Sequence, residues 1–260
     1  MSERFFVAQL TTTGEITLSG PEAHHLIHVM RGHVGQQVVL FDGLGHEAVA
    51  EITAIQKKTA VLRIAEHGTV SRELPVAVTV ASPLPKGDRE RFFIEKLTEL
   101  GVTAFIPLIT HRSVVQPDEN VVNRLRRIVI EASKQCGRNH LMDVTAPCKW
   151  EKLIAEPQEG VTRLFAHPFS VERDGPPQPL GSDRTSGLPA SLEALLTSEK
   201  VLVAVGPEGG LTPEEVGQAL AKRWIQVDLG PRILRVETAA IVLAVLVGTI
   251  RQVRAQTQGS

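Results

Sequence analysis

The chain has 260 residues, 42% of them hydrophobic, and a formal net charge of −1, which allows one large domain or two modest ones with a sizeable core. It contains no run of about 18 apolar residues and no signal-peptide pattern, so we expect neither a transmembrane helix nor secretion. The two cysteines form no disulfide framework, and a reducing cytoplasm is the expected compartment.

The N-terminal part of the chain is rich in predicted strands. Turn signals at Asp42-Gly43 and Leu44-Gly45 separate some of them. Strands are expected at residues 4–7, 37–41, 47–52 and 60–64, and one helix at 21–30. Short strands at this spacing favour a small β-barrel.

Several histidines lie in or near the helix of that region, and His24 and His28 share one of its faces. No cysteine or carboxylate nearby completes a tetrahedral set, so we expect no metal. Two interpretations stay open: a helix face that covers the barrel, or a weakly basic edge, including Arg31, that faces RNA.

After about residue 73, strands alternate with helices. Strands are expected at 76–80, 105–109, 162–166, 201–205 and 225–229. Helices are expected at 88–100, 123–137, 150–155, 190–197 and 213–222, and from about 236 onward. The alternation predicts an α/β domain with a parallel sheet covered on both faces. Residues 171–189 read as a flexible surface loop and 255–260 as a disordered tail.

The stretch 201–216 combines a buried strand, a glycine loop and a helix start. The loop is Gly206-Pro207-Glu208-Gly209-Gly210, and Thr212-Pro213-Glu214-Glu215 predicts an N-cap with a capping box. Ligands bind beyond the carboxyl ends of such strands. The loop fits neither common phosphate-binding pattern, and Glu208 would repel a phosphate, which leaves S-adenosylmethionine as a candidate. A tight turn without a ligand explains the stretch equally well.

Two further stretches carry charge near helices. In residues 227–240 a strand, a Gly-Pro turn and a helix start follow one another. Glu237 has a structural role there as an acid on the first turn, whereas Arg235 gains nothing from that position, which favours a ligand or partner role. Residues 123–138 contain five basic side chains and one acid, a basic face of the kind that binds nucleic acid.

Together, GPEGG after a strand and the later LGPRILRVETAA resemble the C-terminal signature of the SPOUT methyltransferases. Within that superfamily the chain is most similar to the ribosomal RNA small-subunit (16S rRNA) uracil-N3 methyltransferases. The matching segments also include residues 86–89 with 94–102, 111–113 and 127–138. His25-Leu26 with Val29-Met30-Arg31 resembles the family's N-terminal PUA-like barrel.

The resemblance implies a PUA-like RNA-binding β-barrel at 1–72 and a SPOUT methyltransferase domain with a C-terminal trefoil knot at 73–256. It also implies a homodimer, S-adenosylmethionine as cofactor, and 16S ribosomal RNA in the small ribosomal subunit as partner. The lack of a long apolar run adds the expectation of no membrane attachment. The product would be 3-methyluridine. The cofactor-binding residues implied by position are Ala166, His167, Pro168, Val205, Gly206, Pro207, Glu208, Gly209, Gly210, Leu229, Gly230, Ile233, Leu234 and Thr238.

Methylation at uracil N3 requires loss of the N3 proton and stabilisation of charge on the two carbonyl oxygens. Arg235 and Arg138 are the candidate charge stabilisers, and Glu237 is a candidate base whose capping role explains it equally well. For Arg138, a phosphate contact is an alternative. The candidate RNA-binding residues are His25, Arg31, Lys86, Arg89, Arg112, Arg124, Arg127 and Lys134.

Two other functions stay open. One is a non-catalytic RNA-binding or ribosome assembly protein that keeps the fold, which would not need the cofactor. The other is a SPOUT methyltransferase that modifies a ribose 2′-hydroxyl or a guanine, which mapping of the methyl group on RNA would reveal.

Overall fold

The computed structural model describes residues 3–156, 159–168, 195 and 197–258. The expected loop at 171–189 and most of the expected helix at 190–197 lie outside them. The chain forms two compact units. Unit 1 is Met1–Glu73 with Arg127–Leu141, and unit 2 is Leu74–Arg126 with Met142–Ser260.

Unit 1 is built on a five-stranded sheet in the order β1-β3-β4-β5-β2. Its strands are β1 (Arg4–Phe6), β2 (Glu15–Leu18), β3 (Gln37–Phe41), β4 (His46–Ile55) and β5 (Ala60–Thr69). Both turn signals are confirmed: Gly43 and Gly45 have φ of +76° and +103°, and Asp42 Oδ1 accepts hydrogen bonds from Leu44 N and His46 N. The strand β2, which has alternating polar residues and pairs with β5, was not predicted from the sequence.

The helix expected at 21–30 is two elements. α1 (Gly20–His24) continues into the π-helix η1 (His25–Val29), and Met30 N donates to His25 O at 2.9 Å. Burial explains the location, since Ala23 and Leu26 belong to the core that the sheet of unit 1 forms.

Helix α3 (Glu119–Cys136) contributes residues to both units, because its part from Arg127 onward belongs to unit 1. It begins earlier than expected. Asp118 Oδ1 accepts a hydrogen bond from Val121 N at 2.8 Å, so Asp118 caps the helix before Glu119. Asn120 and Asn123 therefore lie inside the first turns of the helix.

Unit 2 contains a parallel sheet in the order β12-β10-β11-β6-β7-β8, with β9 also pairing β7. Its strands are β6 (Ala77–Ser82), β7 (Ala104–Ile109), β8 (Asp143–Val144), β9 (Cys148–Lys149), β10 (Val161–Ala166), β11 (Lys200–Val205) and β12 (Ile225–Val227). Its other helices are α2 (Arg89–Glu99), α4 (Trp150–Ala155), α6 (Pro213–Ala221) and α7 (Val236–Gln258). The predicted α/β parallel sheet is therefore confirmed.

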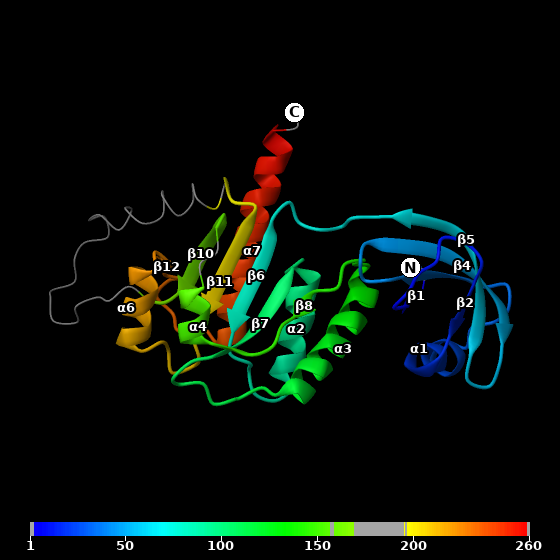
Figure 1. Cartoon of the computed structure of the whole chain (residues 1–260), viewed down its shortest axis with the longest axis horizontal. Helices are drawn as coiled ribbons and strands as arrows, with labels where there is room; N and C mark the ends of the chain where they lie inside the picture. Colours follow the sequence, from blue (N-terminus) through cyan, green and yellow to red (C-terminus); the bar gives the residue numbers. More distant parts are fainter. Residues whose placement is uncertain (1–2, 157–158, 169–194, 196, 259–260) are drawn as a thin grey trace. The chain divides into compact units, whose positions relative to one another are not determined.

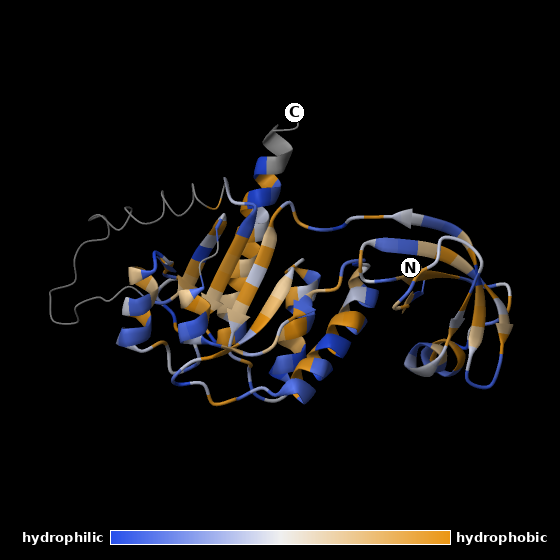
Figure 2. Ribbon diagram, in the orientation of Figure 1, coloured by the Kyte–Doolittle hydropathy of each residue, from blue (hydrophilic) through white to orange (hydrophobic). Residues whose placement is uncertain are grey.

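The central strands of unit 2 are apolar on both faces (Figure 2). On one face, Leu202 and Ala204 of β11 join a core cluster with Trp150 of α4 and Ala219 of α6. α7 packs on β11 and β6 and also contacts α2 (Figure 1). Helices thus cover the sheet, and the carboxyl ends of its parallel strands share one edge.

The helix α7 differs from expectation at its end. It continues to Gln258, so the expected disordered tail is wrong for residues 255–258. Val236–Arg254 is long and apolar enough to span a membrane by length and composition, with a mean hydropathy of 1.6. Core helices of soluble proteins pass the same test, and 44% of that window is buried in the structure.

Candidate functional site

Three loops of unit 2 start side by side at the carboxyl edge of its sheet. Ala166, the last residue of β10, pairs with Val205 of β11 on one side and with Val227 of β12 on the other. The chain therefore leaves these three strands at the same level. The predicted cofactor residues 166–168, 205–210 and 229–234 lie in or beside these loops.

Hydrogen bonds connect the first loop to the third strand. His167 N donates to Val227 O at 3.1 Å. Gln226 Nε2 donates to His167 O at 3.2 Å and to Pro168 O at 2.9 Å. Gln226 was not predicted as a site residue, because nothing in the sequence of a short strand distinguishes a side chain that binds a neighbouring loop.

The glycine loop is a tight turn. Gly210 N donates to Pro207 O at 2.8 Å, and Gly210 has a φ of +70°, which favours glycine. The predicted cap of α6 is confirmed: Thr212 Oγ1 accepts from Glu215 N at 3.2 Å, and Glu215 Oε2 accepts from Thr212 N at 2.8 Å. The capping box fixes where the loop ends and the helix begins.

The loops combine exposed apolar surface with an exposed carboxylate. Ile233 is 98% exposed, and the carboxylate of Glu208 is exposed in the glycine loop. Burial lowers the pKa of His167, and the Asp228 carboxylate opposes that shift only in part, so the imidazole is neutral at pH 7. A neutral imidazole near an exposed carboxylate does not repel a sulfonium.

The candidate catalytic residues have different surroundings. Arg235 is exposed directly before α7, and Thr238, a predicted cofactor residue, is exposed in its first turn. Glu237 is buried, its Oε1 lies 3.1 Å from Arg89 Nη1, and its Oε2 has no hydrogen-bond partner among the described residues. Arg138 lies in unit 1, where it is 4% exposed and binds Glu73 through two nitrogens at 2.8 and 2.5 Å.

The candidate RNA-binding residues also divide by environment. Arg31, Lys86 and Arg127 are exposed, and Arg31 has an unusual φ of +54°. Lys134 is buried in unit 1, with Nζ 3.2 Å from both Glu22 Oε1 and Glu131 Oε1. The ion pairs of Lys134 and Arg138 give both residues a structural role in unit 1.

The remaining candidates contact other side chains or loops. His25 is half-buried, with its ring edge-on to Phe5 at a centroid distance of 6.0 Å. Arg124 pairs with Glu90 at 2.8 Å, Arg89 pairs with Glu237, and Arg112 Nη1 donates to Gly209 O at 2.6 Å. Arg112 therefore belongs to the surroundings of the glycine loop.

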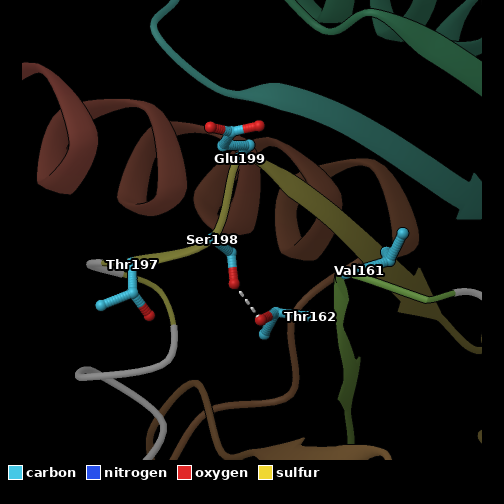
Figure 3. Close-up of a pocket in the computed structure, with 6 residues that line it drawn as sticks. Val161, Thr162, Thr197, Ser198 and Glu199 are labelled. Carbon is cyan, nitrogen blue, oxygen red and sulfur yellow. Dashed lines mark hydrogen bonds between the residues drawn. The ribbon is translucent and has the colours of Figure 1, made fainter.

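A separate depression lies at the other end of the strands, at the amino ends of β10 and β11 (Figure 3). Thr162 Oγ1 and Ser198 Oγ form a hydrogen bond at its wall. It is lined by Gly160, Val161, Thr162, Thr197, Ser198 and Glu199. Because it lies at the amino ends of these strands, it is not part of the site formed by the three loops.

Two family models match the chain: an RNA methyltransferase domain at residues 72–248 and an RNA methyltransferase PUA domain at 18–65. The chain is also 32% identical over 247 residues to the ribosomal RNA small subunit methyltransferase E of Bacillus subtilis, covering 92% of this chain and 93% of that one. The chain belongs to the ribosomal RNA small subunit methyltransferase E family. The Synechocystis member is 36% identical over 227 residues, covering 87% of this chain and 70% of that protein.

Two solved structures agree with that assignment. The ribosomal RNA small subunit methyltransferase E from Neisseria gonorrhoeae, bound to S-adenosyl methionine, matches with a TM-score of 0.80 and 30% identity. A putative methyltransferase from Legionella pneumophila in complex with the same cofactor matches with a TM-score of 0.80 and 31% identity. Each match covers 96% of this chain and 98% of the other chain. The predicted family is thus confirmed.

Proposed function

We propose that this protein transfers a methyl group from S-adenosylmethionine to N3 of a uracil in 16S ribosomal RNA. The observation that carries the proposal is the register of β10, β11 and β12, which starts the three predicted cofactor loops at one edge of the sheet. The names of the relatives support an activity on small-subunit ribosomal RNA, and two similar structures hold the cofactor.

The residues of the three loops fit this cofactor. The backbone of Gly206–Gly210 offers polar groups without side chains in the way, and Ile233 and Leu229 offer apolar surface for an adenine ring. Glu208 and the neutral His167 tolerate a positive sulfonium. When bound, the cofactor supplies an electrophilic methyl group.

Arg235 is the charge stabiliser in this proposal. Its guanidinium is exposed beside the third loop, where it can donate to a uracil carbonyl oxygen that gains negative charge as N3 loses its proton to water. Glu237 instead positions the first turn of α7 through Arg89, since one of its carboxylate oxygens is paired and the other is buried. Arg138 keeps a structural role through Glu73.

For RNA binding, the knot, the oligomeric state and the compartment, our proposal is based on the family. We propose that the PUA-like domain binds RNA through exposed basic groups such as Arg31, and that Arg127 of α3 contributes to the same task. We also propose the trefoil knot, a homodimer, and a cytoplasmic protein that acts on the small ribosomal subunit. The apolar, exposed side chains Val245, Leu246 and Val253 of α7 are candidates for the dimer contact.

The test is methyl transfer to small ribosomal subunits that lack the modification, with labelled cofactor and mass spectrometry of the nucleosides. We expect 3-methyluridine. A 2′-O-methylated nucleoside or a methylguanosine would keep the enzyme and change the target atom. No transfer, together with RNA binding by protein that does not bind the cofactor, would support the assembly-factor alternative.

A further inference from the structure

The loop between β7 and α3 contains a turn that its own residues stabilise. Thr110 N donates to Ser113 Oγ at 2.9 Å, and Ser113 N donates to Thr110 O at 3.1 Å. The two hydroxyl oxygens lie 3.0 Å apart and share a further hydrogen bond. His111 and Arg112 lie at the tip of this turn, and the hydrogen bonds between Thr110 and Ser113 fix their positions.

Both tip residues contact the segment that contains the glycine loop. Arg112 Nη1 donates to Gly209 O at 2.6 Å, and a Cβ at Gly209 would lie 3.3 Å from Arg112 Cδ, so the aliphatic part of the side chain also packs there. His111 N donates to Glu215 Oε1 at 2.9 Å. The turn therefore binds the glycine loop at Gly209 and the start of α6 at Glu215.

Glu215 is the central residue of this arrangement. It is 4% exposed, and its second oxygen accepts from Thr212 N at 2.8 Å in the capping box. Its backbone oxygen accepts from the indole of Trp150, a fully buried residue of the core, at 3.2 Å. Both carboxylate oxygens thus bind backbone N–H groups on two different loops.

We infer that Arg112 and Glu215 are positioning residues of the cofactor site, which hold the glycine loop in its binding conformation. This inference rests on the proposed function, in which Gly206–Gly210 binds S-adenosylmethionine. A loop with three glycines has little rigidity of its own, because glycine has many accessible conformations. Hydrogen bonds from charged donors are strong, and a preordered loop binds its ligand more tightly.

Arg112 was a candidate RNA-binding residue by its sequence, and this inference gives it a different role. An RNA phosphate contact and a bond to a loop carbonyl predict different losses. Loss of a phosphate contact weakens RNA binding and lowers the dependence of that binding on salt by about one unit of log–log slope. Loss of the hydrogen bond to Gly209 O weakens cofactor binding and leaves the affinity for RNA and its salt dependence unchanged.

The experiment compares Arg112→Met with Arg112→Lys in steady-state methyl transfer, with isothermal titration of S-adenosylmethionine. Methionine keeps the aliphatic packing and removes the donor, whereas lysine keeps a charged donor. We expect Arg112→Met to raise KM and Kd for the cofactor by about tenfold, the loss of one charge-assisted hydrogen bond. The KM for RNA and its salt slope should not change, and Arg112→Lys should recover most of the loss.

A second pair of variants tests Glu215. Glu215→Gln leaves only one acceptor for two N–H groups, so it should weaken cofactor binding in the same way, while its fold is checked by circular dichroism. Glu214→Gln is the matched control, since this exposed neighbour also carries a charge near His111 and Arg112 but accepts no hydrogen bond from the 110–113 turn in the described structure. It should bind the cofactor like the unmodified protein.

The outcomes separate the inference from the proposed function. An unmodified protein that does not bind S-adenosylmethionine overturns both. An unmodified protein that binds it, with Arg112→Met and Glu215→Gln binding equally well, overturns the inference alone. A higher KM for RNA and a lower salt slope in Arg112→Met, with cofactor affinity unchanged, would make Arg112 an RNA ligand and also overturn it.

Discussion

Arg89 Nη1 lies 3.1 Å from Glu237 Oε1, and this ion pair joins the first residue of α2 to the first turn of α7. The Glu237 side chain is 7% exposed, and its other oxygen has no hydrogen-bond partner in the described part of the chain. A paired, buried carboxylate is poorly placed to take a proton from a substrate. The contact therefore argues for a structural role of the acid in the RVETAA segment.

Glu237→Gln should have a small effect on the chemical step. It keeps the shape of the side chain and the carbonyl oxygen that Arg89 binds. We expect the single-turnover rate of methyl transfer to fall less than about tenfold, whereas removal of a general base lowers rates by about a hundredfold or more. A hundredfold fall that excess alkali partly restores would identify Glu237 as the base.

Arg89→Met should destabilise unit 2, because it leaves the Glu237 carboxylate buried without a partner. Since Arg89 is itself 36% exposed, we expect a loss of about 1–2 kcal/mol in the free energy of unfolding, below the range for a fully buried pair. Urea unfolding of both single variants and of the double variant measures the coupling. If the losses were simply additive, the ion pair would contribute nothing to stability.

The basic residues of α3 should respond differently to charge reversal. Arg127 is exposed, so Arg127→Glu should weaken RNA binding and leave the melting temperature nearly unchanged. Lys134 is buried against Glu22, so Lys134→Glu places a third acid beside two others and should destabilise unit 1. Filter binding and thermal denaturation of both variants test this. A selective loss of RNA affinity in Lys134→Met would restore Lys134 as an RNA contact.

Gly206 allows a sharper test of the cofactor loop. A Cβ at Gly206 would lie 3.0 Å from Leu211 Cγ and 3.2 Å from Leu211 N, so Gly206→Ala should shift the loop and weaken cofactor binding, and the larger Gly206→Val should abolish it. Gly217 in α6 has open space around it, and Gly217→Ala should stabilise the helix by about 1 kcal/mol and leave binding intact. Titration with S-adenosylmethionine compares them. Full affinity in Gly206→Val would mean that the ligand binds elsewhere.

Unit 1 should lose stability in acid. Partial burial raises the pKa of Asp42 and of Glu47, but hydrogen bonds from Leu44 and His46 to Asp42, and from Arg72, Asn139 and Arg4 to Glu47, outweigh burial and lower both pKa values.

Because these folded pKa values lie below the reference values of 3.8 and 4.5, the stabilisation is complete above those values and is lost as the pH falls through the folded ones. Urea unfolding from pH 6 to 3 should show this loss. Glu47→Gln should flatten the profile, and an unchanged profile would contradict the assignment.

Local sequence determined most of the elements near the candidate site. The run of apolar residues in β11, the glycines at 206–210 and the Thr212–Glu215 capping box each depend on neighbours within a few positions, so the strand, turn and helix start were predictable. Composition and alternation predicted the parallel sheet in the same way. The start of α3 could not be predicted in this way, because Asp118, Asn120 and Asn123 are all good caps by residue type.

Only the tertiary structure determined which charges are available to a ligand. Arg112, Lys134 and Arg138 look alike in the sequence, as basic residues in segments that resemble the methyltransferase family. Their partners are Gly209, Glu22 and Glu73, between 65 and 112 positions away along the chain. Charge and spacing are local properties, whereas burial and pairing depend on which distant strands and helices meet. The sequence therefore determined the loops of the site, and the fold decided which distant group each of these charged side chains binds.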